Sequence, residues 1–591
     1  MALLSGCGGT STTTTTTVTP PPATTLEGNV TAGQHPVSGS EIALDAVTPG
    51  SAPVNLFGTT AVATGASGTF TATTSIQCPS STTQVYLVAR GGNPGLASGT
   101  NNSALVLMMA LGNCGDLSAT ASYAINELTT VVSAWALSQF LGPDAAVSSS
   151  ATNSTGLGNA FKTAQDLVNP TTGLTPGTAL PQGALPEVGK INTLANVISA
   201  CADSEGTTAC SALFAAATAG GVQPANTLDA ALNVVRNPAA NVAAIFNLAA
   251  GSGPFSPALS AAPHDWTLSI TYGGGGLNLP GSIAVDSSGD IWAANYFGAV
   301  VSEFLPTGAP AAAAGFPGTG LQNSFGLAID SNNNVWVTNE NSVSAAGNSG
   351  LGSVSEFSPS GMELSGAGYT GGGIYYPQGI AADAAGDIWI ADYGHSSASL
   401  ISDNGTAISG AAGYGASALP FTPAVAADSS GNGWFAVEGA AVKVTPTGTV
   451  TRFSCCVDPA GVAVDQSGNI WLADYGGAGI VKLTPAGAIA ATVESPGGID
   501  AAQGITIDGA GNVFAANFRG DSITELAGST AAVLSPAAGF GLDAPLSEPY
   551  GIAIDAGGNV WVSNAGDNTV TQFVGLASPV KTPLTGPPII P

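Results

Sequence analysis

Amide, carboxylate and aromatic side chains recur at one position of a repeated sequence pattern, and together they have the chemistry to bind a hydroxyl-rich or peptide ligand. Most follow the second predicted strand of a copy, at Asn295, Tyr296, Asn339, Glu340, Asp392, Tyr393, Glu438, Asp474, Tyr475, Asn517 and Asn564, with His395 and Arg519 just beyond. Three others, Gln378, Gln503 and Tyr550, stand at the start of a first strand. Because the second strand runs antiparallel to the first, both sets of loops emerge on one side. The pattern predicts a ligand-binding face there; the alternative is that the Asn and Asp side chains only cap turns.

Residues for a chemical reaction are harder to find. The sequence has no Gly-x-Ser-x-Gly motif and no phosphate-binding loop, and the four glycines at 273–276 have no Lys behind them. A repeated acidic position could suit calcium, but each copy stands at a hairpin turn, where the side chain can bond backbone N–H groups. The members are Asp286, Asp330, Asp383, Asp428, Asp465, Asp508 and Asp555. We predict no catalytic residue, no metal ligand and no cofactor, and Mg²⁺ or Ca²⁺ has no support.

The repeat itself is the strongest signal in the chain. Residues 281–292 read GSIAVDSSGDIW, and this frame occurs in seven copies, with successive Asp residues 37 to 53 positions apart. Six of the eight tryptophans occupy one repeat position. Each copy predicts four short strands, which can bury their faces only against neighbouring copies. The repeat therefore predicts a seven-bladed β-propeller with the tryptophans packed between blades.

Closure of the ring has its own candidate in the sequence. Residues 266–272 form an alternating strand before the first repeat, and the final repeat ends its third strand at Phe573. We expect the early strand to supply the outer strand of the last blade.

The repeat frame P-x-G-I-A-V-D-x-x-G-N-I-W-x-A-D-Y resembles the NHL-repeat propellers and the related virginiamycin B (streptogramin) lyases. The lyase resemblance implies a Mg²⁺-assisted ring opening of a cyclic peptide by a His pair on neighbouring blades. The predicted propeller has one His after its opening strand, His395, so the His pair of the virginiamycin B lyases is not matched. Amidating lyases with NHL blades need His ligands for zinc, and these are not matched for the same reason. We therefore favour a binding or scaffold protein over the alternative of a metal-dependent lyase acting on a cyclic peptide or polysaccharide.

Two further domains precede the propeller, so the fold class is multidomain and mainly β. Residues 26–116 alternate apolar and polar positions in short strands, including 85–88, which predicts a half-buried β-sandwich. Residues 28–44 resemble the carboxypeptidase regulatory-like domains of bacterial surface proteins. From 117 to 262 the apolar period changes to three and four, as at Ile125, Leu128, Val132 and Phe140, which predicts an Ala-rich bundle of helices. The propeller spans 263–591.

The seven cysteines indicate an exported protein. Residues 4–7, Leu-Ser-Gly-Cys, resemble the lipobox of bacterial lipoproteins, which implies acylation of Cys7, and residues 8–25 form a Thr- and Pro-rich tether. The spacings of the other cysteines suit disulfides better than zinc ligands. They predict one bond between Cys78 and Cys114 and another between Cys201 and Cys210. For the adjacent Cys455 and Cys456, a bond and two free thiols remain open.

Composition restricts the partners. Nine Lys and Arg stand against 37 Asp and Glu, a formal net charge of -28, which excludes nucleic acid as a partner because affinity for phosphates rests on basic side chains. No run of about 20 apolar residues occurs to span a membrane. We expect a monomer in the cell envelope, held to the membrane only by its lipid, that recognises an extracellular glycan, peptide or protein.

Overall fold

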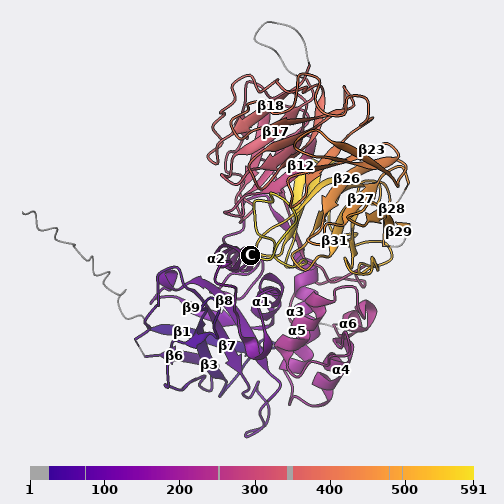
Figure 1. Cartoon of the computed structure of the whole chain (residues 1–591). Coiled ribbons are helices and arrows are strands. Elements are labelled where there is room, and N and C mark those ends of the chain that lie inside the picture. The colour runs from indigo at the N-terminus through magenta and orange to yellow at the C-terminus, as the bar shows by residue number, and fades with distance from the viewer. Residues whose placement is uncertain (1–24, 74, 250–252, 342–350, 478, 495–496) are drawn as a thin grey trace, which may run out of the picture.

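The computed structural model describes residues 25–591 except for 74, 250–252, 342–350, 478 and 495–496. The architecture is mainly β, with many small sheets and few helices (Figure 1). Of the helices within the described ranges, none combines the length and apolar character that a membrane crossing requires. Cys7 and its tether lie outside the described residues.

Two sheets form the N-terminal part of the molecule. The first holds β1 (Leu26–Ala32), β2 (His35–Pro36), β6 (Thr69–Ala72) and β9 (Ser122–Ile125); the second holds β3 (Glu41–Ala46), β4 (Val54–Asn55), β5 (Val62–Ala63), β7 (Gln84–Arg90) and β8 (Val106–Asn113). Leu26, Leu44 and Leu107 belong to one core shared by both sheets. Because β9 pairs in parallel with β1, this β region continues to Ile125, beyond the predicted boundary at residue 116.

A helical segment follows, whose described residues contain six α-helices. They are α1 (Glu127–Ala136), α2 (Ser154–Leu167), α3 (Val188–Ala202), α4 (Thr208–Ala216), α5 (Thr227–Arg236) and α6 (Val242–Leu248). Asn126 caps α1, since its Oδ1 accepts from the Thr129 backbone N–H at 3.0 Å while Thr129 Oγ1 accepts from the Asn126 N–H at 3.0 Å. The helical pattern predicted from Ile125 to Phe140 is longer than the helix, because Ile125 lies in β9 and α1 ends at Ala136.

The sheet of β7 and β8 is buried on both faces. Leu87 and Leu107 face the core shared with the first sheet, whereas Tyr86 and Met108 belong to the core that contains α1. The prediction of a half-buried strand at 85–88 was wrong, because helices cover the second face.

Seven sheets follow one another around a ring. They comprise β12 (Pro280–Val285), β13 (Ile291–Asn295), β14 (Val300–Phe304) and β15 (Phe316–Pro317); β16 (Ser324–Ile329), β17 (Val335–Asn339) and β18 (Ser353–Phe357); β19 (Pro377–Ala382), β20 (Ile388–Asp392) and β21 (Ser397–Ile401); β22 (Ala424–Ala427), β23 (Gly433–Val437), β24 (Ala440–Val444) and β25 (Val450–Ser454); β26 (Pro459–Val464), β27 (Ile470–Asp474), β28 (Gly479–Leu483) and β29 (Ile489–Glu494); β30 (Ala502–Ile507), β31 (Val513–Asn517) and β32 (Ser522–Leu526); and β33 (Pro549–Ile554), β34 (Val560–Asn564) and β35 (Thr569–Phe573), extended by β11 (Ser269–Gly273) and β10 (Leu185–Pro186). The first strand of each sheet packs on the first strand of the next, and β33 packs on β12.

The number of strands varies around the ring. The sequence predicted four strands in every copy, but the sheets that begin at β16, β19 and β30 contain three. An isolated bridge, such as Ala398 with Tyr414, stands where the fourth strand was expected.

The repeated tryptophans pack between neighbouring sheets, as predicted. Trp292 shares a cluster with Leu327 and Val335 of the following sheet, and Trp471 shares one with Ile507. The repeated Asp holds the turn before each Trp strand. In one copy, Asp330 Oδ1 accepts from the N–H groups of Asn332 and Asn334 at 2.8 and 2.9 Å, and Oδ2 accepts from Trp336 Nε1 at 3.0 Å.

The strand predicted to close the ring does so. Residues 269–273 form β11, which pairs antiparallel with β35 over five residues. Thr271 and Thr571 share a hydrogen bond of 2.9 Å between their hydroxyls, and Tyr272 OH donates to Gln572 Oε1 at 2.9 Å. Two segments about 300 residues apart therefore form one sheet.

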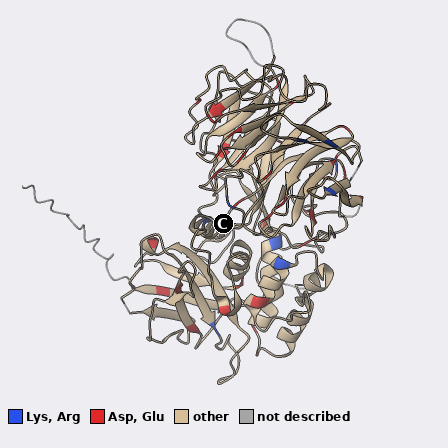
Figure 2. Cartoon of the chain, in the orientation of Figure 1, with Lys and Arg blue, Asp and Glu red and all other residues tan. Residues whose placement is uncertain are grey.

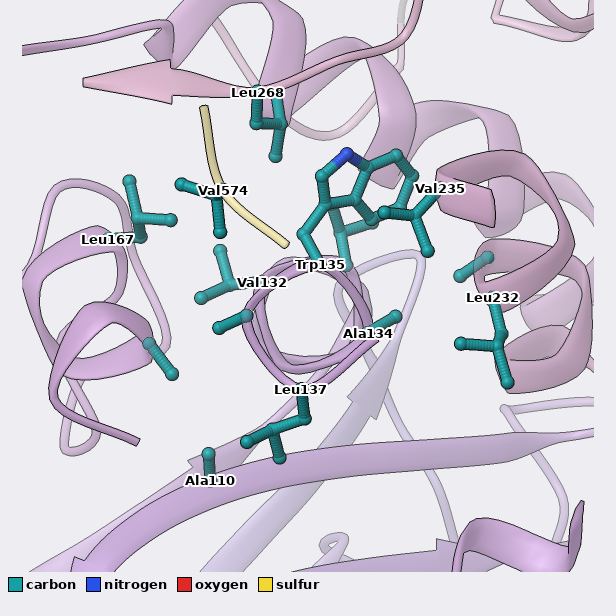
Figure 3. Packing of buried hydrophobic residues seen from close by; sticks show 14 of the residues in the cluster. Ala110, Val132, Ala134, Trp135, Leu137, Leu167, Leu232, Val235, Leu268 and Val574 are labelled. Atoms are coloured by element: carbon teal, nitrogen blue, oxygen red, sulfur yellow. The ribbon is translucent and has the colours of Figure 1, made fainter. Parts of the chain in front are cut away.

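One hydrophobic core joins the helices to the ring. Trp135 of α1, Leu268 just before β11 and Val574 just after β35 pack together (Figure 3). Trp135 Nε1 donates to the Trp266 carbonyl at 3.0 Å. The helical segment and the last sheet are thus one packed unit.

A buried Lys also links the two. Lys190 of α3 is 2% exposed, and its Nζ lies 2.8 Å from Glu187 Oε1, 3.9 Å from Asp265 Oδ1 and 3.8 Å from Asp543 Oδ2. It also donates to the Thr267 carbonyl at 2.9 Å. A single cation is therefore shared by three carboxylates from both sides of the junction.

Both predicted disulfides are present, Cys78–Cys114 and Cys201–Cys210. Cys455 and Cys456, whose state the sequence left open, are bonded to each other.

Candidate functional site

A channel runs through the ring, lined by the first strands of the seven sheets. At the end where these strands start, the free space is about 140 Å³, and in the deeper part it is about 220 Å³. Residues such as Ile283, Ile380 and Val462 line both spaces, so the two are adjacent along the axis of the ring. We call the end where the first strands start, with the loops that leave the second strands, the rim.

Small residues set the width of this channel at two positions of the repeat. The position nearer the rim holds Ser282, Gly326, Gly379, Ala424, Gly461, Gly504 and Gly551, and the deeper position holds Ala284, Ala328, Ala381, Ala426, Ala463, Thr506 and Ala553. A Cβ at Gly461 would collide with the carbonyl oxygen of Gln503 on the next first strand. Glycine is needed here because neighbouring strands approach so closely.

The end of the channel opposite the rim is covered by the C-terminal segment 578–591. Ser578 N–H donates to Asp508 Oδ2 at 3.0 Å, Thr582 Oγ1 donates to the Asp286 carbonyl at 2.6 Å, and Gln466 Nε2 donates to the Pro588 carbonyl at 2.7 Å. Side chains of this segment, including Val580 and Leu584, line the deeper space.

Helix α2 packs on the same side. Asn159 Nδ2 donates to the Ser288 carbonyl at 3.0 Å, and Asn153, which caps α2, donates to the Ala556 carbonyl at 2.9 Å. The helices and the C-terminal segment therefore both cover the side opposite the rim, which leaves the rim as the accessible face of the channel.

Six of the predicted ligand contacts are buried and belong to the loops themselves. Asn295, Asn339, Asp392, Asp474, Asn517 and Asn564 are at most 4% exposed. Asn295 Nδ2, for example, donates to Ser302 Oγ at 2.9 Å, and Asp392 Oδ2 accepts from Ser399 Oγ at 2.6 Å. Burial raises the pKa of Asp392 well above its usual range. The burial of these six supports the alternative that their side chains hold the loops, and replacing Asp392 or Asp474 should cost stability.

The other predicted residues remain at the rim. Glu340 accepts from Tyr296 OH at 3.1 Å and from Gln378 Nε2 at 2.6 Å, which links three neighbouring sheets. Gln503 and Tyr550 line the outer part of the channel. These partly buried polar groups surround its mouth.

Exposed rim residues lie further from the axis. His395 stacks on Tyr375 with ring centroids 3.9 Å apart, and Arg519 lies 5.1 Å from the centre of the Tyr475 ring and donates to its hydroxyl at 3.0 Å. Glu438 is exposed, and its carbonyl accepts from Arg452 at 2.6 Å. Charged residues are sparse over the whole molecule (Figure 2).

The rim also contains aromatic residues that the sequence analysis missed, namely Phe297, Phe325, Tyr375, Tyr376, Phe421 and Phe518. Phe325 contacts both Tyr296 and Tyr550 edge-on, at 6.4 and 5.7 Å between centroids. Phe421 is 52% exposed and packs against Tyr393, which is 38% exposed. Phe325 lies in β16, at the repeat position that holds Tyr550 in the last copy, and the other five lie in the loops that flank the first and second strands.

One group of carboxylates among the described residues has the spacing for a cation. Oxygens of Asp286, Asp290 and Glu303 lie within 4.8 Å of one another. Burial, together with the neighbouring acids, raises the pKa of Asp290 to about 6 and that of Glu303 to about 7. The cluster suits a divalent cation or a shared proton, and it lies next to α2, away from the rim.

Comparison with known proteins gives structural neighbours only. No family model and no curated protein matches the chain. A streptogramin B lyase is 16% identical, with 51% of this chain and 97% of that chain covered and a TM-score of 0.39. A catalytically inactive virginiamycin B lyase from Staphylococcus aureus with quinupristin is 18% identical, covering 51% and 96%, with a TM-score of 0.41. The extracellular domain of a putative hybrid two component system from B. thetaiotaomicron is 17% identical, covering 50% and 39%, with a TM-score of 0.39. Similarity at this level does not indicate a shared ligand or reaction.

Proposed function

We propose that the ring is a seven-bladed β-propeller of the NHL type, and that it is the binding module of an exported cell-envelope protein whose rim recognises an extracellular glycan or peptide. The observation that carries this proposal is the asymmetry of the two ends. The helices and residues 578–591 cover one end, whereas the other presents exposed aromatic rings around polar groups.

The chemistry of the rim favours a neutral, hydroxyl-rich ligand. Aromatic faces such as Tyr393 and Phe421 bury the apolar faces of sugars or side chains, while Gln378 and Gln503 offer both donors and acceptors. The exposed charged groups of the rim loops are mostly acidic, and they include Asp458, Asp500, Asp521, Glu548 and Asp567 beside Glu438, with Arg519 as a cation. An anionic ligand would therefore be repelled.

Replacing Tyr393 and Phe421 together with Ala is expected to weaken glycan or peptide binding at least about tenfold, because exposed aromatic anchors carry much of the energy of such sites. The probes are a panel of neutral oligosaccharides and short peptides, screened by thermal shift and then titrated calorimetrically. The control is Ile489→Ala, which removes an exposed apolar side chain from the outer strand β29. Unchanged affinity in the double variant would rule out this rim as the binding surface.

The remaining regions complete the proposal. The two N-terminal sheets form a β-sandwich of the carboxypeptidase regulatory-like type that acts as a spacer, and the chain works as a monomer. The disulfides Cys78–Cys114 and Cys201–Cys210 support export to an oxidising compartment.

Membrane attachment through Cys7 has a direct test. Cells that export the protein and receive a labelled fatty acid should incorporate the label, and Cys7→Ser should abolish it. Cys455→Ser is the matched control, since that thiol pairs with Cys456. Label that persists in Cys7→Ser would contradict the anchor.

A further inference from the structure

Three carboxylates meet on the first sheet of the ring, in the group beside α2. Asp286 and Asp290 flank the turn between β12 and β13, and Glu303 lies on β14 directly opposite Trp292. Oxygens of the three acids lie within 4.8 Å of one another. Asp286 and Glu303 are 3% and 6% exposed, whereas Asp290 is partly exposed. Acids this close repel one another unless a proton or a cation lies among them.

The protein itself does not neutralise this group. Within the part of the chain that the structure describes, the side chains of Asp290 and Glu303 make no hydrogen bond and no ion pair. Lys162 of α2 is close enough to act on Asp290 through its charge, but its Nζ donates to Asn159 Oδ1 at 3.2 Å. Carboxylate oxygens therefore remain free to bind another group.

The buried Trp292 side chain is a second sign that something is missing here. In four other copies the indole N–H donates to Oδ2 of the repeated Asp at 2.9 to 3.2 Å, namely to Asp330, Asp428, Asp465 and Asp555. Trp292 is fully buried, and its N–H faces Asp286, yet it has no hydrogen-bond partner among the described residues. An unpaired buried N–H costs free energy. The first copy therefore differs from the others in what Asp286 Oδ2 binds.

The fourth copy shows which kind of group fits beside the repeated Asp. The residue opposite its Trp is Lys443, and Lys443 Nζ lies 3.4 Å from Asp428 Oδ2. The fifth copy also has a lysine there, Lys482. The first copy has Glu303 at this position and Asp290 where most copies have Asn, and of the seven copies it alone has acids at both positions. A place that holds an ammonium group in another copy is thus surrounded by three acids.

We propose that Asp286, Asp290 and Glu303 bind a divalent cation, Ca²⁺ in preference to Mg²⁺. Three oxygens at this spacing can reach one ion at the Ca–O distance of about 2.3–2.6 Å, and water can complete the shell on the side of the partly exposed Asp290. Mg²⁺ requires shorter bonds and near-ideal octahedral geometry, whereas Ca²⁺ tolerates an irregular shell. The site is independent of the rim.

The position of the site gives the ion a structural role. Asn159 of α2 donates to the Ser288 carbonyl at 3.0 Å, and Thr582 of the C-terminal segment donates to the Asp286 carbonyl at 2.6 Å. Both elements that cover the deep end of the channel are therefore attached to the turn that carries the acids. A cation that fixes this turn strengthens the attachment of both.

Calorimetric titration of the full chain, freed of metal with a chelator, tests the proposal with CaCl₂ and MgCl₂ at constant ionic strength. We expect one Ca²⁺ per chain with a Kd below about 1 mM, as in extracellular calcium modules, and at least about tenfold weaker binding of Mg²⁺. Saturating Ca²⁺ should raise the melting temperature by at least about 3 °C. Absence of calcium binding would overturn the site, and equal affinity for both ions would overturn the preference.

A double variant locates the ion. Asp290→Asn with Glu303→Gln reproduces the side chains of the last copy, which folds in this protein with Asp555, Asn559 and Gln572. It should bind Ca²⁺ at least about tenfold more weakly and melt no lower than the unmodified chain when both are free of metal. Glu356→Gln, at the matching position of the second copy, is the control and should not change the affinity. Unchanged calcium affinity in the folded double variant would overturn the proposal.

Trp292 supplies a readout of position. Tb³⁺ takes oxygen ligands, is close to Ca²⁺ in size, and emits when a nearby indole is excited. Bound Tb³⁺ should emit through Trp292, and Ca²⁺ should displace it. Trp292→Phe is compatible with the fold, since the sixth copy has Phe514 at this position. This variant should keep its calcium affinity within about twofold and lose most of the emission. Undiminished emission from Trp292→Phe would place the ion elsewhere and contradict the proposal.

Discussion

Replacing Lys190 with Met is expected to lower the stability of the junction between helices and ring by about 3–5 kcal/mol, because removing one partner of a buried ion network leaves the others uncompensated. Lys190 Nζ is the cation within 4 Å of Glu187, Asp265 and Asp543, and all three would lose it. Although burial opposes it, hydrogen bonds from His264 and the charge of Lys190 hold the pKa of Asp543 below its usual range. Met keeps the length of the side chain, so the effect reports the charge.

The measurement is thermal unfolding followed by calorimetry, which separates transitions in a chain of several regions. Lys443→Met is the matched control, since Lys443 lies 3.4 Å from Asp428 in a partly exposed pair and should change stability by less than about 1 kcal/mol. Equal and small shifts in both variants would show that the network at Lys190 does not hold the junction together.

The protein is expected to become less stable as pH rises from 5 to 8.5. Burial raises the pKa of Glu127 to about 7, and those of Asp166 and Glu525 to about 8. The folded state then holds protons that the unfolded state has released above about pH 4.5, so the unfolded state binds fewer protons and stability falls with pH. The protonated forms stabilise fully below the unfolded pKa values, and this contribution is lost as pH rises through 7 and 8.

Melting temperatures across this range should fall by at least about 5 °C, given that each kcal/mol moves the midpoint of a large domain by about 2–4 °C. Glu525→Gln should make the pH dependence shallower, whereas Glu438→Gln, at an exposed position, should leave it unchanged. Below about pH 4 a second loss is expected, because the pKa values of Asp428 and Asp543 are held low. A stability that is flat or rises between pH 5 and 8.5 would contradict the assignment of these buried acids.

The ring of sheets could be predicted from the sequence because the same sequence pattern is repeated in every copy. Each copy carries the same Asp turn, and six of the seven carry the same Trp, so a single hydrogen-bonding pattern, as at Asp330, is encoded several times over. The closing strand β11 was also predictable, because it alternates in polarity and has no partner nearby in the sequence. Pairing between β1 and β9 was not predictable, since nothing local in residues 122–125 distinguishes a parallel strand from the start of a helix.

The site was predicted less well because Asn and Asp suit both loops and ligands. A Ser or Thr hydroxyl on the third strand distinguishes the structural role from ligand contact, because it forms a hydrogen bond with the side chain. Asn295 pairs with Ser302, Asn517 with Thr524 and Asn564 with Thr571, each seven residues further on. This spacing was visible in the sequence and marks a structural amide. The exposed aromatic residues, such as Phe421, lie in loops outside the repeat frame, so the frame gave no reason to select them.

The pairing of β11 with β35 has a consequence for the order of folding. The two strands are about 300 residues apart, so the ring cannot close during synthesis until the last repeat has emerged. Until then both ends of the growing array present unpaired strand edges, which are templates for aggregation. The earlier helices already pack around residues 266–272, with Trp135 bonded to Trp266. If the helical segment folds first, it holds β11 in position as an unpaired strand edge. The final strand, β35, can then pair with β11 as soon as it has been synthesised.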